Sequence, residues 1–200
     1  MMTERVDEGE GPPDEDRPRL AGADPAAEFG RLFDRYARPL HRYLARRVGA
    51  ETADDQVSET FLIALRQRRS YDPAQGAVRS WLYGIATNLL RRHVRDEVRA
   101  LRATARAAGQ LPQPHPGHDG RVADRVDAAV LAGRLAAALA ELSEGDRDVL
   151  LLSSWAEMDS AGIAETLGIP VGTVRSRLHR VRTRLRATAP TAPSKEESHD

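Results

Sequence analysis

Residues 159–186 constrain the fold of this chain more than any other stretch, because they have the pattern of two short helices joined by a tight turn. Asp159 is a good N-cap for the first helix. Gly168 stands where a helix commonly ends in a left-handed residue, and Pro170 suits the first turn of the next helix. The apolar face expected for the first helix is Ile163, Ala164 and Leu167.

The second helix of this pair is basic. Its apolar residues recur at helical spacing and share one face: Val174, Leu178, Val181 and Leu185. At about 100° per residue, the opposite face carries Ser176, His179, Arg180 and Thr183, with further arginines along the flanks. This is the helix-turn-helix pattern. A surface helix with solvated charges is the alternative, but arginines without balancing acids repel one another unless phosphates are near.

The composition fits a nucleic-acid partner for part of the chain. The 200 residues have a net charge of zero, but residues 1–28 are acid-rich and the second helix is purely basic. There is no cysteine, which excludes disulfides, thiol catalysis and cysteine-based zinc sites. No long apolar run or basic signal peptide is present, so the sequence predicts a cytoplasmic protein without membrane insertion.

The N-terminal part predicts an acidic disordered tail over 1–25, followed by a helix over 26–48 with a kink at Pro39. The apolar stripe of this helix is Phe29, Leu32, Phe33, Tyr36, Leu40, Tyr43, Leu44 and Val48. Gly49 ends the helix, and Thr52 is the expected cap of the next one. The buried face expected there is Val57, Phe61, Ala64 and Leu65.

An acidic edge is left outside that second helix: Asp54, Asp55, Ser58, Glu59 and Leu62. Paired carboxylates can act in catalysis or bind metal. Acids are also favoured near a helix N-terminus, and a solvated or partner-facing edge is the preferred interpretation.

Residues 69–78 read as a loop, and a helix is expected from Arg79 to Arg99. Its apolar face is Leu82, Ile85, Ala86 and Leu89. Another face gathers Trp81, Asn88, Arg91, Arg92 and Arg95. Such a stripe suits single-stranded nucleic acid, because the aromatic stacks on a base, the amide reads a base edge and the cations follow the backbone. Spacing alone allows equally that Trp81 is core and the arginines are surface.

Residues 100–124 are expected to be a flexible linker between two small helical domains, so the fold class is all-α. His115, His118 and Asp119 lie in this segment, which offers no preorganised metal site. A second domain over 125–187 begins with a helix to Leu142, and Ser143 with Asp146 forms the capping box of the next helix. The core of that helix is Val149, Leu150, Leu152 and Trp155, and 188–200 is a disordered tail.

These motifs together resemble the extracytoplasmic-function (ECF) group of bacterial RNA polymerase sigma factors. IPVGTVRSRLHRVRTRLR is similar to the family's −35-binding helix, ADDQVSETFLIAL to its core-polymerase-binding helix and VRSWLYGIATNLLRRHVR to its −10-reading helix. The resemblance covers residues 26–99 and 125–187, and it favours the functional interpretation of Trp81 and Asn88.

The resemblance implies a polymerase subunit and not an enzyme, with no cofactor and no metal. It implies three partners: core RNA polymerase, promoter DNA and an anti-sigma factor. The site residues that it implies for core-polymerase binding are Asp54, Asp55, Ser58, Glu59 and Leu62. Those for the −10 element are Trp81, Asn88, Arg91 and Arg92, beside the loop over 71–78. Those for the −35 element are Gly172, Thr173, Arg175, Ser176, Arg177, His179, Arg180 and Arg184.

The chain departs from the family pattern at two positions. Glu157 stands where the family usually has Gly, and Gly162 where it has Glu or another helix former. Two other functions each fit part of the sequence. A helix-turn-helix regulator acting without polymerase leaves Trp81, Asn88 and the acidic edge unexplained. A metal-dependent hydrolase using Asp54 and Asp55 would need a converging histidine, which the spacing does not supply.

Overall fold

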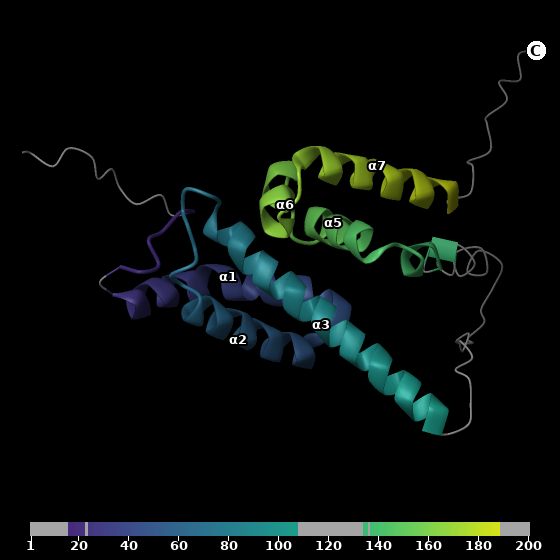
Figure 1. The fold of residues 1–200 in the computed structure, drawn as a ribbon, viewed down its shortest axis with the longest axis horizontal. Coiled ribbons are helices and arrows are strands. Elements are labelled where there is room, and N and C mark those ends of the chain that lie inside the picture. The colour runs from purple at the N-terminus through teal and green to yellow at the C-terminus, as the bar shows by residue number, and fades with distance from the viewer. Residues whose placement is uncertain (1–15, 23, 108–133, 136, 189–200) are drawn as a thin grey trace, which may run out of the picture. The chain divides into compact units, whose positions relative to one another are not determined.

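The structure is a computed structural model that describes residues 16–22, 24–107, 134, 135 and 137–188. Regular structure in these ranges is helical (Figure 1), which confirms the all-α prediction. The helices are α1 (Pro25–Val48), α2 (Ala50–Arg66), α3 (Val78–Ala107), α5 (Glu144–Ser154), α6 (Ser160–Leu167) and α7 (Val171–Thr188). The chain divides into two compact units, one containing α1, α2, most of α3 and nearly all of α6, the other the end of α3 with α5 and α7.

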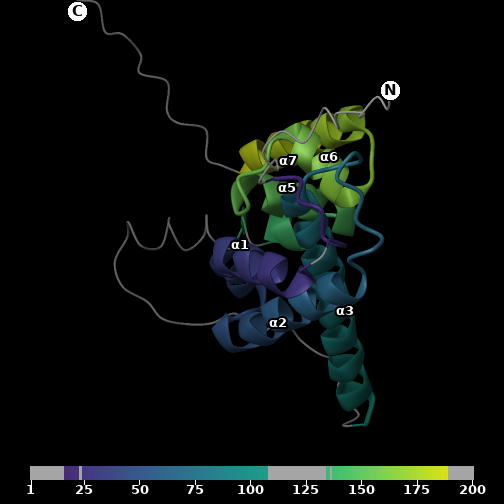
Figure 2. The same ribbon diagram turned by 90° about the vertical axis from the view of Figure 1, so that its left-hand side faces the viewer.

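Helices α1 and α2 pack side by side as an antiparallel pair (Figures 1 and 2). Asp24 caps α1 by accepting a hydrogen bond from the backbone N–H of Ala27 at 3.0 Å. The helix continues through Pro39 and ends at Gly49, whose φ of 82° suits a residue without a Cβ. The next helix begins directly at Ala50. The prediction of Thr52 as its cap is therefore wrong, because the turn at Gly49 leaves no room for a separate cap.

Helix α3 is joined to α1 through buried aromatic residues. Tyr43 is fully buried, and its hydroxyl shares a hydrogen bond of 3.1 Å with the hydroxyl of Thr87, so no polar atom of this pair is left unsatisfied. The ring of Tyr43 meets the ring of Tyr83 edge-on, with centroids 5.3 Å apart. This contact fixes the rotation of α3 about its own axis, and so decides which of its side chains face outward.

The helix expected over 79–99 is longer than predicted. It runs to Ala107 and takes in residues 100–107, which the sequence assigned to the linker. The reason is that these residues are Ala, Leu, Arg and Thr, most of them strong helix formers, and the first Gly follows only at residue 109. Residues 108–124, including His115, His118 and Asp119, lie outside the described part of the chain, as do 125–133 and 189–200.

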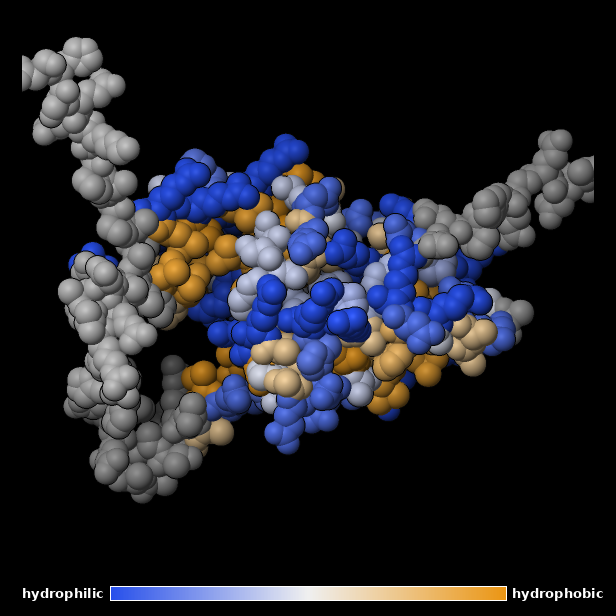
Figure 3. Space-filling view, turned by 180° about the vertical axis from the view of Figure 1, so that it is seen from behind, coloured by the Kyte–Doolittle hydropathy of each residue, from blue (hydrophilic) through white to orange (hydrophobic). Residues whose placement is uncertain are grey.

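Two apolar residues predicted to be buried are exposed. Phe33 is 48% exposed and Leu65 38% exposed. Phe33 instead packs its ring against that of Phe61 across the α1–α2 surface, at 5.0 Å between centroids. Leu62 is exposed as expected. Figure 3 shows such apolar areas lying between charged side chains on one face of the molecule.

The start of the chain is less of a tail than its composition suggests. Leu20 is 2% exposed, and Pro18 is also buried, although both fall within the stretch expected to be disordered. The prediction of a disordered tail is wrong for residues 16–22. It relied on the low average hydrophobicity of the N-terminal segment, and an average does not show that single apolar residues such as Leu20 are buried.

In the second unit, α5 packs against α7. Ser143 caps α5 as predicted, accepting from the N–H of Asp146 at 3.2 Å. The Arg147 guanidinium donates to the backbone carbonyls of Leu139, Ala140 and Leu142, the last carbonyls of the helical turn before α5. Apolar residues of both helices form the core: Val149, Leu151, Leu152, Val174, Leu178 and Val181.

Candidate functional site

Residues 160–174 run from helix α6 through a tight turn into helix α7. Helix α6 begins directly after Asp159 and is followed by Gly168 at φ 63°, the left-handed residue that the sequence predicted. The carbonyl of Pro170 accepts from the N–H groups of Thr173 and Val174 at 2.9 and 3.2 Å. Pro170 therefore stands just before the first residue of α7, and not inside its first turn.

Helix α7 has one buried and one exposed face. Val174, Leu178 and Val181 are buried, and Leu185 is half-buried. Opposite them, the polar residues expected to meet DNA reach solvent: Gly172, Arg175, Ser176, His179, Arg180 and Arg184 are exposed, and Thr173 and Arg177 are half-buried. The Ser176 hydroxyl donates to the carbonyl of Thr173 at 2.9 Å, which holds that side chain against its own helix.

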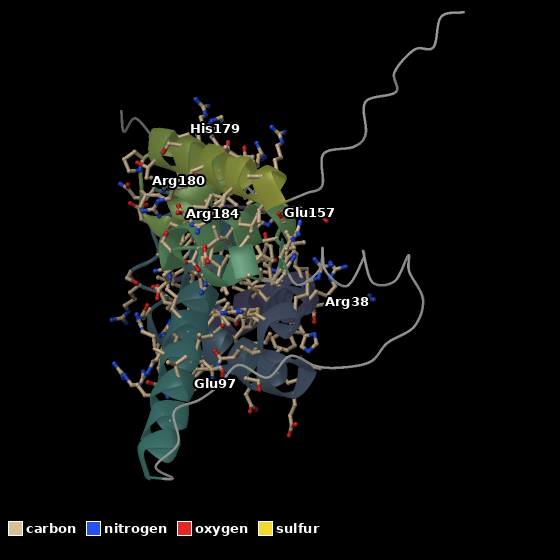
Figure 4. All side chains as sticks on the ribbon, turned by 90° about the vertical axis from the view of Figure 1, so that its right-hand side faces the viewer. Arg38, Glu97, Glu157, His179, Arg180 and Arg184 are labelled. Carbon is tan, nitrogen blue, oxygen red and sulfur yellow. The ribbon has the colours of Figure 1, made fainter. Side chains whose placement is uncertain are left out.

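Two of the arginines on α7 are paired with acids of the same unit. The Arg180 guanidinium donates to both carboxylate oxygens of Asp146 at the start of α5. Its Nε donates to Oδ2 at 3.2 Å and its Nη2 to Oδ1 at 2.7 Å. Arg184 pairs with Glu141. Figure 4 shows Arg180 and Arg184 on the side of α7 toward α5, whereas His179 points away from it. Helical periodicity placed Arg180 on the same face as His179. It could not show that Asp146 of α5 lies beside Arg180.

The pairing has an electrostatic consequence. The Arg180 guanidinium, through its hydrogen bonds, lowers the pKa of Asp146 below its ordinary value, although burial of the carboxyl opposes this shift. The Asp146 side chain is 10% exposed, while that of Arg180 is 62% exposed. The buried Asp146 carboxylate thus fixes the orientation of the exposed Arg180 guanidinium.

The second candidate surface lies at the start of α3. Trp81 is half-buried and stacks at a tilt on the Tyr71 ring, with centroids 5.1 Å apart. Asn88 and Arg92 are exposed, and Arg91 is half-buried with its guanidinium 3.5 Å from the Asn88 amide oxygen, at the long limit of a hydrogen bond. The four predicted residues do share one side of the helix, beside the loop that carries Tyr71.

That loop is internally ordered. The Tyr71 hydroxyl donates to the carbonyl of Gly76 at 3.1 Å. The Asp72 carboxylate accepts from the N–H of Ala74 at 2.9 Å, which is an Asx-turn. The Tyr71 ring, which is itself buried, is therefore held in place next to the half-buried Trp81 ring and braces it.

The third surface is the acidic edge of α2. Asp54, Asp55, Ser58 and Leu62 are exposed and Glu59 is half-buried, as the helical spacing predicted. His41 of α1 lies 3.3 Å from the Asp54 carboxylate, a neighbour that the sequence pattern did not indicate. The exposed Phe33 also belongs to the α1–α2 surface, and its place in an apolar stripe concealed it.

A metal-binding cluster and a membrane-spanning helix are both absent from the described residues. No group of three or more His, Asp or Glu side chains could hold a metal ion there. None of the described helices is both long enough and apolar enough to cross a bilayer.

Known proteins match both units. Residues 32–100 match the family Sigma-70 region 2, and residues 132–185 match Sigma-70, region 4. The ECF RNA polymerase sigma factor SigL of Mycobacterium tuberculosis is 36% identical over 174 residues, which are 84% of this chain and 92% of SigL. The RNA polymerase sigma factor CnrH of Cupriavidus metallidurans is 32% identical over 186 residues, covering 86% and 94%.

Solved structures agree with this. CnrH, in complex with the cytosolic domain of CnrY, has a TM-score of 0.58 and 26% identity, covering 87% of this chain and 96% of that one. The sigma factor RpoE of Bartonella quintana, in complex with the anti-sigma factor NepR, shares the fold at a TM-score of 0.56 and 21% identity, covering 82% and 97%. Two matched regions in this order rule out a helix-turn-helix regulator that acts apart from polymerase, and the chain belongs to the ECF sigma factors of RNA polymerase.

Proposed function

We propose that α7 reads the −35 element of the promoter in the major groove. The observation that carries this proposal is the exposure of Arg175, Ser176 and His179 opposite a buried apolar face. Arg175 can bond a guanine edge with two N–H groups. Gly172 and Thr173, at the helix N-terminus, would lie against phosphates, with the Thr173 N–H also donating to the Pro170 carbonyl. Arg177, Arg180 and Arg184 lie beside this face and would support it at the DNA backbone or at base edges.

We propose that the face of α3 holds the unpaired non-template strand of the −10 element. Trp81 offers a half-buried ring for stacking, and Asn88 offers a donor and an acceptor to one base edge. Arg91 and Arg92 would follow the strand's phosphates. The buried Tyr71 ring that braces Trp81 supports this assignment, because a ring that receives an unstacked base must itself be held in place.

We propose that the acidic edge of α2 docks on core polymerase through Asp54, Asp55, Ser58, Glu59 and Leu62. Exposed acids next to an exposed leucine suit a partner surface that is both basic and apolar. Phe33 extends the apolar part of that surface.

The remaining proposals concern the whole chain. Residues 26–99 would form the domain for core polymerase and the −10 element, and 125–187 the domain for the −35 element, with 1–25 and 188–200 as tails and 100–124 as the connection. The protein would act in the cytoplasm as a transcription factor without enzyme activity or cofactor. Because RpoE is seen with the anti-sigma factor NepR, we also expect an anti-sigma factor to bind this chain.

Run-off transcription with core RNA polymerase on genomic fragments, followed by mapping of start sites, tests the proposal. We expect this chain to create defined start sites that core polymerase alone does not produce. Reversing Asp55 and Glu59 to lysine should weaken core binding while leaving the helical circular dichroism unchanged. The same reversal at Glu97 and Glu157, both exposed and outside α2, is the charge-matched control. Equal core affinity of the two variants would place the docking surface elsewhere.

A further inference from the structure

The short segment of residues 16–20, here called the N-terminal strap, is anchored to the body of its unit. Leu20 is 2% exposed and Pro18 is buried. Burying an apolar side chain of this size contributes about 1.5–3 kcal/mol, so Leu20 is an effective anchor. In Figure 1 the strap is the purple stretch before α1.

A second anchor joins the strap to α1. The Asp16 carboxylate accepts from the Arg35 guanidinium at 2.8 Å and from the Tyr36 hydroxyl at 3.3 Å. Burial, above all, raises the pKa of Tyr36, so its hydroxyl stays protonated and keeps its donor. Asp16 is thus held from α1 by one charged and one neutral donor.

From this anchored position the strap bonds directly to the loop before α3. The carbonyl of Asp16 accepts from the N–H of Val78, the first residue of α3, at 2.7 Å. The Arg17 guanidinium donates to the carbonyl of Pro73 at 2.6 Å. One bond therefore reaches the end of the loop at Val78, and the other reaches its middle at Pro73. Figures 1 and 2 show the strap lying next to this loop.

The loop held in this way carries Tyr71, which stacks on Trp81. The loop also has short-range bonds of its own, the Tyr71–Gly76 bond and the turn at Asp72. The strap adds long-range bonds from a segment more than fifty residues earlier in the sequence. The strap therefore links the loop that carries Tyr71 to the start of α1 and of α3.

We propose that the strap positions the loop of residues 71–77 for capture of an unpaired −10 base, with Arg17 as its positioning residue. The proposal rests on the assignment of Trp81 and Asn88 to the −10 strand. Arg17 itself need not touch DNA. It holds the Pro73 carbonyl, and through the loop it fixes the buried Tyr71 ring that braces Trp81, the ring on which the base is received.

The test uses the full chain with core polymerase and compares Arg17→Ala with Arg31→Ala. Arg31 makes an exposed pair with Glu28 on α1 and serves as the control for loss of a surface arginine. Two readouts are taken. One is permanganate reactivity of −10 thymines on a duplex promoter and on a template with a pre-opened mismatch bubble. The other is acrylamide quenching of Trp81 in a Trp155→Phe background, because the chain has only two tryptophans.

We expect Arg17→Ala to slow opening of the duplex promoter about five- to tenfold, less than the full value of a hydrogen bond to a charged group because Arg17 is exposed. The bubble should restore most of the activity, and Trp81 should become more accessible to acrylamide. Arg17→Lys should recover part of the effect, since it keeps a cationic donor. Arg31→Ala should match wild type in both readouts.

Unchanged opening with Arg17→Ala would overturn the strap's role, as would an equal defect on duplex and bubble templates. Unchanged quenching of Trp81 would overturn it as well, because the loop would then be held by other means. Trp81→Ala is run in parallel. If Trp81→Ala impairs opening and Arg17→Ala does not, only the strap inference fails. If Trp81→Ala opens duplex promoters normally, the −10 assignment itself fails.

Discussion

The outward faces of α7 and α3 are built on different plans. Helix α7 presents arginines, and two of them are already paired with acids, Arg180 with Asp146 and Arg184 with Glu141. Helix α3 presents a half-buried tryptophan and an amide, and the tryptophan is braced by the buried Tyr71 ring from the preceding loop. The first surface is carried by one helix, whereas the second is assembled from separate segments.

This difference matches the two forms of DNA that we propose for them. A duplex is a rigid ligand, and a helix with side chains in fixed orientations suits its groove. An unpaired strand has no shape of its own, so the protein must supply the pocket that receives a flipped base. We expect defects in α7 to change which promoters are bound, and defects around α3 to change whether bound promoters open.

The largest effect expected from this comparison is at Trp81. Stacking of one base on an aromatic ring contributes about 1–3 kcal/mol, so Trp81→Ala should slow duplex opening by about ten- to a hundredfold. A pre-opened bubble should rescue part of this loss. Asn88→Ala should instead relax the base preference of the −10 element. Permanganate footprinting and transcription on both templates measure these effects.

Normal opening by both of these variants, if they stay folded, would reduce the α3 face to ordinary surface. It would also remove the contrast with α7. A loss that is equal on duplex and bubble templates would mean that Trp81 acts in core binding or folding.

A smaller effect is expected within α7, where Arg175 and Arg180 should differ. Arg175 is exposed, and a bidentate contact with guanine is worth about 1–3 kcal/mol of discrimination. Arg175→Ala should thus lower the preference for the best −35 sequence over a scrambled one by about tenfold. Arg180→Ala should lower it less, because its donors already bind Asp146. Electrophoretic mobility shifts of the holoenzyme on both sequences compare the two variants.

Equal loss of affinity on both sequences would make Arg175 a phosphate contact. An Arg180 defect as selective as that of Arg175 would mean that the pair with Asp146 opens on DNA.

Local sequence rules predicted α7 better than the α3 surface, for a physical reason. The pattern of residues 159–186 depends on neighbours in sequence: the start of α6 after Asp159, the left-handed Gly168 and the helical repeat of Val174 and Leu178. Contacts of the loop beside Trp81 come from residues more than fifty positions earlier, such as Arg17 to Pro73. No periodicity relates such residues, so the strap and the Asp146–Arg180 pair could not be foreseen.

A still smaller effect concerns the Asp146–Arg180 pair and its dependence on pH. The pKa of Asp146 is lowered in the folded state, because its ionised carboxylate accepts hydrogen bonds from Arg180 there. The folded chain therefore favours the ionised form more than the unfolded chain does. The pair therefore stabilises the fold at pH values above the unfolded pKa of about 3.9. This contribution is lost as the pH falls through the lower, folded pKa. Asp146→Asn should cost about 1 kcal/mol near neutral pH, a small value because Arg180 is largely exposed.

Urea unfolding at neutral and acidic pH measures this difference. The gap between wild type and Asp146→Asn should be constant near pH 7 and should close toward pH 3. A gap that stays constant down to pH 3 would show that packing or the capping box, and not the ionised pair, accounts for the loss.

The smallest expected effect is a gain in stability at Glu157, the position where the family usually has Gly. Glu157 adopts φ 52°, in the left-handed region that disfavours residues with a Cβ. Replacing Glu157 by Gly would relieve this backbone strain without loss of buried contacts, since the Glu157 side chain is exposed. The left-handed strain of about 1–2 kcal/mol is partly offset by the greater freedom of Gly in the unfolded chain, about 0.5–1 kcal/mol. Glu157→Gly should thus stabilise the protein by about 0.5–1 kcal/mol.

Glu157→Ala is the matched control, because it removes the same charge but keeps the Cβ that causes the strain. It should show no comparable gain in thermal unfolding. Since Glu157 lies outside α7, both variants should keep the wild-type preference for the −35 sequence, which separates stability from DNA reading in this unit. A gain with Ala as large as that with Gly would assign the effect to the charge, and the left-handed backbone at Glu157 would then carry no strain that matters.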